Sequence, residues 1–211
     1  FLDVDLEQNL EKLIDNLISK DKTFYNLHKQ IGLISFTKRE LNFESLTRII
    51  INQQLSSSAA KTIFSRFKKL FPNQENLTPQ LINEIKFETI REQGVSTSKT
   101  EYIKNLSMTF LEHPNLINSW KDLEDELALN EIQKIKGLGP WSANIILLFY
   151  MGRENIFPFG DTTLKKAFLN LYNKSLDKDL VELKWAEPFK SVVALYFWKW
   201  VDNGMIELKH I

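Results

Sequence analysis

Hydrophobic residues recur along this chain with the spacing of an α-helix. Near the N-terminus an apolar stripe runs through Leu6, Leu10, Leu13 and Leu17, which share one face if the segment is helical. The strict alternation of apolar and polar residues that is typical of a half-buried strand is scarce. We therefore expect an all-α fold. Helices are predicted over Asp21–Lys29, Phe43–Asn52, Ser56–Leu70, Ser96–Leu111, Asp122–Ile135, Pro140–Met151, Thr162–Tyr172 and Pro188–Val201, with short helical turns inside Leu81–Arg91.

A glycine turn separates two of the predicted helices. Gly137 and Gly139 allow the chain to bend tightly, and Pro140 suits the first position of the helix that follows. Unpaired amides at the start of a helix form a site for a phosphate group. The segment 129–151 is therefore interpreted as a helix-hairpin-helix, in which the amides of Gly137, Gly139 and Trp141 bind one DNA phosphate without reading the base sequence. An ordinary corner between two helices is the alternative.

A single carboxylate stands at the start of the next predicted helix. Asp161 precedes Thr162 and Leu164, and aspartate in this position is a common helix N-cap. A fixed carboxylate can also stabilise positive charge that develops on a sugar when a glycosidic bond breaks. The two roles are compatible with each other.

Composition excludes several classes of site. The chain has 211 residues, of which 43% are hydrophobic and 26% charged, as in an ordinary globular protein. It contains no cysteine, which excludes disulfides, iron–sulfur clusters and thiolate zinc sites. The histidines at positions 28, 113 and 210 are scattered, so we expect no metal site built from side chains. No apolar run approaches the ~20 residues of a membrane span.

The formal net charge is zero, with 27 basic and 27 acidic residues. This balance counts against a strongly basic nucleic-acid-binding domain, although a local basic face is sufficient for phosphate contacts. Such a face is offered by Lys61, Arg66, Lys68 and Lys69, which are otherwise interpreted as a solvated helix surface.

The motifs at 137–143 and at Asp161 resemble the helix-hairpin-helix, Gly/Pro-rich, Asp-containing DNA glycosylase superfamily, and within it the 3-methyladenine DNA glycosylase II branch. The resemblance covers roughly residues 21–203 and implies an all-α fold of two lobes with the active cleft between them. It implies a lobe of about 1–40 plus 175–211 and a second lobe of about 41–174 that contains the hairpin. Residues 1–20 are predicted to be helical, so we do not expect the extra β-rich N-terminal domain of bacterial relatives. Further matching stretches are Phe43–Ser56, Gly94–Ser96 with Lys99, Tyr102 and Ile103, and Pro188–Ser191.

The resemblance also assigns roles to residues. It makes Asp161 the catalytic acid. Trp141 stands where lyase-active members carry a lysine, and because tryptophan cannot form a Schiff base, the enzyme is expected to be monofunctional, without lyase activity. Trp141 and Phe189 match aromatic positions that line the base pocket, and Tyr150 and Phe157 are further candidates. Core packing is the alternative for each of these rings.

A base that flips out of the duplex leaves a gap, which a protein side chain must fill. The loop of Gln53, Gln54, Leu55 and Ser56 resembles the wedge loop of the superfamily, with Gln54 or Leu55 as the inserting residue. A simple linker between helices is the alternative. The resemblance also allows a monovalent cation on carbonyl groups of the hairpin, and no other cofactor is expected.

The expected function is the excision of alkylated purines, of the 3-methyladenine and 7-methylguanine type, from double-stranded DNA, which is the first step of base excision repair. The protein is expected to be a monomer that works inside the cell with the DNA. Three alternatives stay open: a non-catalytic DNA-binding module, a helical protein–protein scaffold, and a glycosylase for another base such as hypoxanthine.

Overall fold

The computed structural model describes residues 6–71, 77–176 and 181–204, and within these ranges the backbone forms helices and loops without a strand. The all-α prediction is confirmed, and the predicted helices are present with ends that differ by a few residues. Periodicity does not reveal α8 (Leu116–Lys121) or the 3-10 segment η2 (Val181–Ala186), because both are too short to show a period. The remaining elements are α1 (Leu6–Lys20), α2 (Lys22–Ile31), α3 (Phe43–Asn52), α4 (Ser57–Lys68), α5 (Pro79–Glu84), α6 (Phe87–Arg91), α7 (Thr97–Glu112), α9 (Asp125–Gln133), α10 (Pro140–Ile145), the π-helical turn η1 (Ile146–Tyr150), α11 (Thr162–Tyr172) and α12 (Lys190–Asp202).

The chain divides into two compact units. Unit 1 comprises Phe1–Lys38 and Leu147–Ile211, and unit 2 comprises Arg39–Ile146. The first boundary lies close to the expected residue 40, whereas the second lies at residue 146 and not near 174. The difference follows from the packing of α11 against α12, in which the rings of Phe168 and Phe197 have centroids 6.4 Å apart. The segment that contains α11 therefore belongs with the C-terminal helix.

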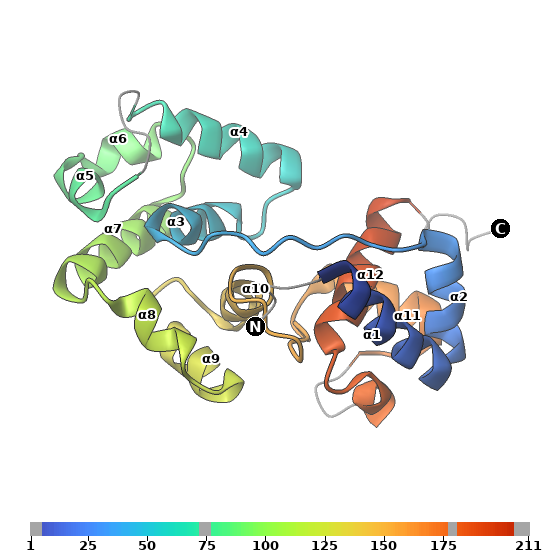
Figure 1. Ribbon diagram of the computed structural model, residues 1–211. Helices are drawn as coiled ribbons and strands as arrows, with labels where there is room; N and C mark the ends of the chain where they lie inside the picture. Colours follow the sequence, from blue (N-terminus) through green and yellow to red (C-terminus); the bar gives the residue numbers. More distant parts are fainter. Residues whose placement is uncertain (1–5, 72–76, 177–180, 205–211) are drawn as a thin grey trace. The chain divides into compact units, whose positions relative to one another are not determined.

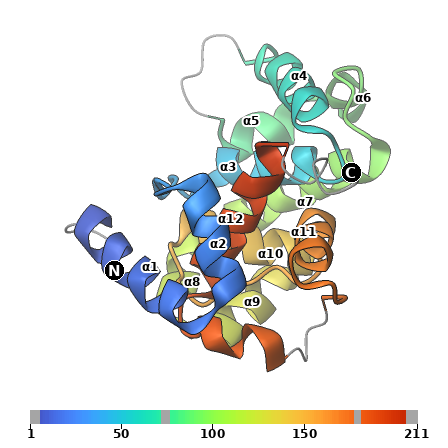
Figure 2. The ribbon, with the colours of Figure 1, turned by 90° about the vertical axis from the view of Figure 1, so that its right-hand side faces the viewer.

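Unit 1 is built from elements at both ends of the chain. The blue helix α2 and the red helix α12 lie side by side in both ribbon views (Figures 1 and 2). Asp21 caps α2 by accepting the amide hydrogen of Phe24 at 2.6 Å, and its carboxylate also accepts the hydroxyl of Tyr172 at 2.9 Å. Tyr196 of α12 donates to the carbonyl of Gly32 at 3.0 Å. Burial raises the pKa of Tyr196 to about 12.

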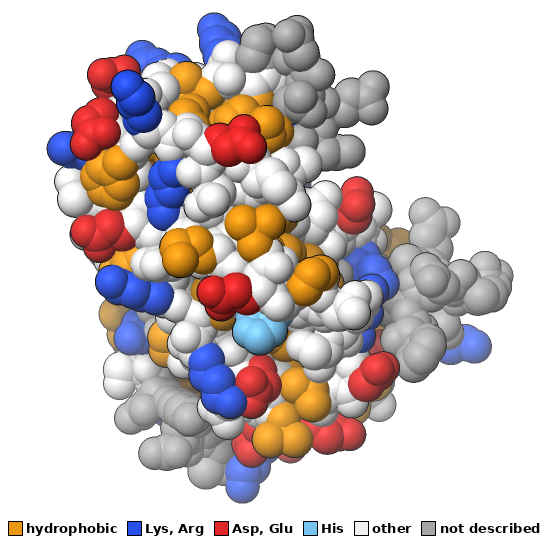
Figure 3. Space-filling model, turned by 90° about the vertical axis from the view of Figure 1, so that its left-hand side faces the viewer, with side chains coloured by type: hydrophobic (Ala, Val, Ile, Leu, Met, Phe, Trp, Pro, Cys, Tyr) orange, Lys and Arg blue, Asp and Glu red, His pale blue; other side chains and the backbone are white. Residues whose placement is uncertain are grey.

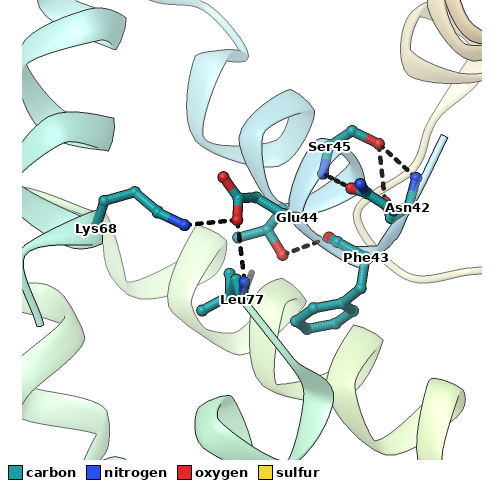
Figure 4. A network of polar contacts seen from close by, with 7 residues as sticks. Asn42, Phe43, Glu44, Ser45, Lys68 and Leu77 are labelled. Carbon is teal, nitrogen blue, oxygen red and sulfur yellow. Dashed lines mark hydrogen bonds and ion pairs between the residues drawn. The ribbon is translucent and has the colours of Figure 1, made fainter. Parts of the chain in front are cut away.

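Unit 2 is organised around α3, whose first turn is held by several polar contacts (Figure 4). Asn42 and Ser45 form a capping box, in which each side chain accepts the other residue's backbone amide at 2.9 Å. The carboxylate of Glu44 accepts from Lys68 of α4 at 2.6 Å and from the amide of Leu77 at 3.0 Å. These contacts connect α3 to α4 and to the segment that precedes α5.

Helix α7 carries two lysines that each cap the carbonyl end of another helix. The ammonium group of Lys99 donates to two carbonyls at the end of α3, and that of Lys104 donates to three at the end of α5. Both positions favour a cation because the C-terminus of a helix carries partial negative charge. Burial lowers the pKa of both lysines. The accepting carbonyls belong to Ile51 and Gln53 for Lys99, and to Ile82, Asn83 and Ile85 for Lys104.

Candidate active site

The predicted helix-hairpin-helix is present, and its first helix, its turn and α10 lie within unit 2. Helix α9 ends at Gln133, the chain turns through Gly137 with φ of +98°, and α10 begins after Gly139. The turn is closed by the amide of Leu138, which donates to the carbonyl of Ile135 at 2.9 Å. Gly139 is the N-cap of α10 and has no side chain to cap the helix, and Pro140 has no amide hydrogen. This helix start therefore lacks the side-chain cap that α2, α3 and α4 have.

Gly137 lies directly against α7. A Cβ atom built on Gly137 would lie 2.5 Å from both Cβ and Cγ of Tyr102, closer than atoms of folded proteins approach. The positive φ of Gly137 is also one that other residues adopt with strain. Gly139, by contrast, has no atom within 4 Å of the corresponding position. The first glycine of the turn is thus required by packing, whereas the second is not.

The predicted wedge loop separates into residues with different surroundings. The side chain of Gln53 is turned inward and hydrogen bonds to the hairpin. Gln54 has a positive φ of 55°, and its side chain is exposed. Leu55 is one of the exposed large hydrophobic residues, at 36%. Ser56 accepts the amide hydrogen of Ala59 as the N-cap of α4. Gln54 and Leu55 are therefore the residues whose side chains face solvent without a capping or anchoring role.

Asp161 lies in unit 1, where it is the N-cap of α11. Its Oδ1 accepts the amide hydrogen of Leu164 at 2.9 Å and the indole hydrogen of Trp198 at 3.3 Å. The residue is only 9% exposed. The capping role expected from the sequence is confirmed, and the indole contact is an addition from α12. Two donors on one oxygen hold the carboxylate in a defined orientation.

Trp198 belongs to a group of partly exposed aromatic side chains in unit 1 that sequence reasoning did not identify. Its ring centroid lies 5.4 Å from that of Phe149, which lies 6.0 Å from that of Phe36. The only hint of Trp198 in the sequence is the run of aromatic residues in the last predicted helix. Because α12 contains four aromatic residues, this run does not show which of them is important. Which of them contacts Asp161 depends on how α12 packs against α11.

The aromatic residues predicted for a base pocket differ in accessibility. Trp141 and Phe189 are half-buried. Tyr150 and Phe157 are buried, at 7% and 4% exposed, and the ring of Phe157 packs 5.1 Å from that of Phe159. Phe157 therefore has a packing role in the core of unit 1. Contact of any of these four residues with a base stays a prediction.

The motif at Pro188–Ser191 also has a local explanation. The hydroxyl of Ser191 donates to the carbonyl of Arg153 at 2.7 Å and accepts the amide hydrogen of Ile156 at 3.0 Å. The amide of Ser191 donates to the carbonyl of Glu154 at 2.9 Å. Ser191 thus holds the loop that leads to Asp161 against the start of α12.

A metal site or a membrane-spanning helix would indicate another kind of function. Among the described residues, no group of three or more acidic or histidine side chains could hold a metal ion, and no helix is long and apolar enough to cross a membrane. His210 lies outside the described residues. In the predicted basic run, Lys68 is paired with Glu44, whereas Lys61, Arg66 and Lys69 are exposed.

A groove of about 540 Å³ lies beside α7, α8 and α9 in unit 2. One of its lysines, Lys134, is paired with Glu131 at 2.6 Å. The face shown in Figure 3 carries basic and acidic side chains interspersed with hydrophobic ones. No single-sign patch on this face indicates a charged ligand.

Comparison with known proteins places this geometry in a family. The family described as HhH-GPD superfamily base excision DNA repair protein matches residues 47–191. The chain belongs to this family. The matched range contains the predicted wedge loop, the hairpin, Asp161 and the motif at 188–191. The glycine turn and the capped aspartate described above are therefore features of an HhH-GPD protein.

Two relatives from Schizosaccharomyces pombe extend the likeness over most of the chain. DNA-3-methyladenine glycosylase 1 is 29% identical over 202 residues, which cover 90% of this chain and 87% of the relative. Alkylbase DNA glycosidase-like protein mag2 is 31% identical over 193 residues, with coverage of 87% and 90%. The structure of the 3-methyladenine DNA glycosylase Mag1 of the same organism in complex with abasic DNA matches with a TM-score of 0.81 at 26% identity, covering 90% of this chain and 97% of that one.

Proposed function

We propose that this HhH-GPD protein is a monofunctional DNA glycosylase that flips alkylated purines out of double-stranded DNA and excises them by hydrolysis. The observation that carries the proposal is the carboxylate of Asp161, oriented by two donors at the start of α11. The names of the relatives, which are glycosylases of 3-methyladenine or of alkylated bases, support the same substrate class. Excision of such a base is the first step of base excision repair.

The reaction breaks the bond between C1′ of the sugar and a ring nitrogen of the base. The electron pair of this bond leaves with the base, which departs uncharged if alkylation had made it cationic. Positive charge then develops on the sugar, as in glycoside hydrolysis. The anion of Asp161 stabilises this charge more than it stabilises the bound substrate. Water adds its oxygen to C1′, and its proton passes to Asp161 or to solvent.

The hairpin and the wedge loop position the DNA. The amides around Gly137, Gly139 and Trp141 bind one phosphate, and the start of α10 adds the partial positive charge of a helix N-terminus. Leu55 or Gln54 enters the space that the flipped base leaves. The half-buried rings of Trp141 and Phe189 stack on the alkylated base, whose positive charge favours an aromatic face. Tyr150 and Phe157, which are buried in unit 1, complete the aromatic residues proposed for the base pocket.

The position at which lyase-active members of the superfamily carry a lysine is Trp141 in this chain. The abasic strand is therefore left uncut, and borohydride is expected to trap no covalent adduct with DNA. We also propose that carbonyl groups of the hairpin hold a monovalent cation. The carbonyls of Ile135 and Gly139 each accept one backbone amide hydrogen, and a carbonyl oxygen has a second lone pair for a cation. The protein works as a monomer, in the cell compartment that holds the DNA.

The deciding experiment incubates methylated DNA with the protein and identifies the released bases by chromatography. The wild type is expected to release 3-methyladenine and 7-methylguanine. Asp161→Asn is expected to lose at least about 100-fold of this activity while still binding abasic DNA. Asp15→Asn, which changes an exposed aspartate of α1, serves as the control and is expected to behave as wild type. DNA binding that weakens with salt, without any release of bases, would favour a non-catalytic binding module.

A further inference from the structure

The side chain of Gln53 connects two segments of unit 2 that are 84 residues apart in the sequence. Gln53 follows the last residue of α3. Its Nε2 donates to the carbonyl of Gly137 at 2.7 Å and to the hydroxyl of Ser142 at 2.9 Å. A side-chain amide nitrogen carries two hydrogens, so both are used on the hairpin. One contact is on the glycine turn and the other is on α10.

Both ends of this connection are themselves fixed on α7. Lys99 donates to the backbone carbonyl of Gln53 at 2.7 Å. Tyr102 lies against Gly137 so closely that no Cβ could stand between them. Lys99 and Tyr102 are three residues apart and therefore lie on the same side of the helix. Gln53 closes a small ring of contacts that runs from the loop to α7, along α7 to the turn, and back to the loop.

The tip of the wedge loop and the start of α10 both lie close in sequence to these contacts. Gln54 turns the chain with its positive φ, and exposed Leu55 follows, two residues beyond Gln53. On the other side, Gly139, which begins α10, lies two residues beyond Gly137. Chains of two residues leave little freedom between an anchored residue and its tip. The side chain of Gln53 is therefore the direct link between the loop tip and the glycine turn.

We propose that Gln53 is a positioning residue that holds the wedge loop at a set separation from the hairpin, so that the grip on the DNA backbone and the insertion of Leu55 or Gln54 occur together. This rests on the proposed function for its catalytic consequence. Gln53 itself touches neither the base nor the sugar in this scheme. Without its side-chain amide, the loop tip loses its direct connection to the turn, and insertion no longer accompanies the phosphate contact.

The first test compares base release from two duplexes that contain the same alkylated purine, one with the lesion paired to a base and the other with it opposite an abasic site. Gln53→Ala is expected to slow release from the paired lesion by about 10- to 100-fold, as small misplacements in active sites do. Release opposite the abasic site is expected to fall less than about threefold, because an unpaired base leaves the stack at lower cost. Equal losses on both duplexes would overturn the proposal.

Two further variants make this comparison specific. Gln53→Glu keeps the length of the side chain but cannot donate to the carbonyl of Gly137, so it is expected to show the same selective loss as Gln53→Ala. A Gln53→Glu protein with the selectivity of the wild type would contradict the proposal. Gln93→Ala removes a glutamine whose side chain donates to the carbonyl of Thr89 at 3.1 Å, within its own segment, and is expected to leave both rates unchanged.

A second measurement does not depend on catalysis. Hydrogen exchange followed by mass spectrometry should show faster exchange of the amides of residues 53–56, 137–139 and 141–142 in Gln53→Ala than in the wild type, with little change in the rest of unit 2. Unchanged exchange in both segments would refute the proposal that Gln53 holds the loop to the hairpin, even if the enzyme is active. If the wild type releases no base from any duplex, the proposed function fails, and the exchange measurement still decides whether Gln53 couples the two segments.

Discussion

The indole nitrogen of Trp198 lies 3.3 Å from Oδ1 of Asp161, the same oxygen that accepts the amide hydrogen of Leu164. Two rigid donors, one from the start of α11 and one from the side of α12, thus meet at one carboxylate atom. A catalytic anion is effective when its orientation does not have to change during the reaction. The contact therefore links the packing of α12 to the chemistry proposed for Asp161.

Replacing Trp198 by phenylalanine keeps an aromatic ring beside Phe149 but removes the N–H donor. Hydrogen bonds to charged groups contribute about 1.5–3 kcal/mol, so the rate of base release by Trp198→Phe is expected to fall about tenfold or more. Binding of abasic DNA is expected to be unchanged. The measurement is single-turnover release from methylated DNA together with an affinity titration.

The control for this variant is Trp185→Phe in the same unit. The indole nitrogen of Trp185 is buried and has no hydrogen-bond partner within the described ranges, so the same substitution removes no hydrogen bond there. The turnover of Trp185→Phe is expected to equal that of the wild type. If both variants lose activity equally, the bond to Asp161 has no special role.

The two glycines of the hairpin are expected to respond differently to alanine. Gly137→Ala introduces a Cβ at 2.5 Å from Cβ and Cγ of Tyr102, and the Cβ atom of Tyr102 cannot move without the backbone of α7. Overpacking costs about 1–3 kcal/mol, and the positive φ adds about 1–2 kcal/mol. Thermal unfolding should show a clear fall in Tm for Gly137→Ala. Gly139→Ala meets no atom within 4 Å and should unfold near the wild-type temperature, and the opposite order would contradict this account of the turn.

Leu55→Ala shortens the exposed side chain proposed to enter the duplex. Base release from a paired lesion is expected to fall about tenfold, because less apolar surface replaces the flipped base and restacking competes better. The unfolding temperature should stay the same, since Leu55 is exposed. Leu127→Ala in α9, where the leucine is 55% exposed, is the matched control. Equal activity of the two variants would exclude Leu55 as the inserting residue and leave Gln54.

Glu44 is expected to make the stability of the protein depend on pH. Burial raises the pKa of Glu44, but the hydrogen bonds from Lys68 and the Leu77 amide, with the charges of Lys68 and Arg48, outweigh burial, so the pKa lies below its ordinary 4.5. A carboxyl group whose pKa is lowered by folding stabilises the fold above its unfolded pKa, and this stability is lost as the pH falls through the folded pKa.

Glu44→Gln is therefore expected to lower the free energy of unfolding by about 1 kcal/mol at pH 7. The difference from the wild type should shrink as the pH falls below about 4.5. Denaturant unfolding at a series of pH values measures both effects. Glu84→Gln, at an exposed glutamate of α5, should show neither, and a pH-independent difference for Glu44→Gln would exclude the charge as its cause.

The sequence by itself determined the helical class and the positions of the longer helices. It also located the glycine turn and the capping role of Asp161. These features depend on residues within one or two turns of each other, so periodicity and the conformational needs of glycine and proline are sufficient to find them. The short α8 was not predicted because six residues are too few to show a helical period.

Only the tertiary structure decided which residues from distant segments contact each other. It turned Gln53 inward to Gly137, brought Trp198 to Asp161, and grouped α11 with α12. In each case the partner lies tens of residues away and is selected by the way whole helices pack. Neighbouring residues of one type, such as Gln53 and Gln54 or the aromatic residues of α12, are equivalent in a local pattern and become different only when packing gives each its own surroundings.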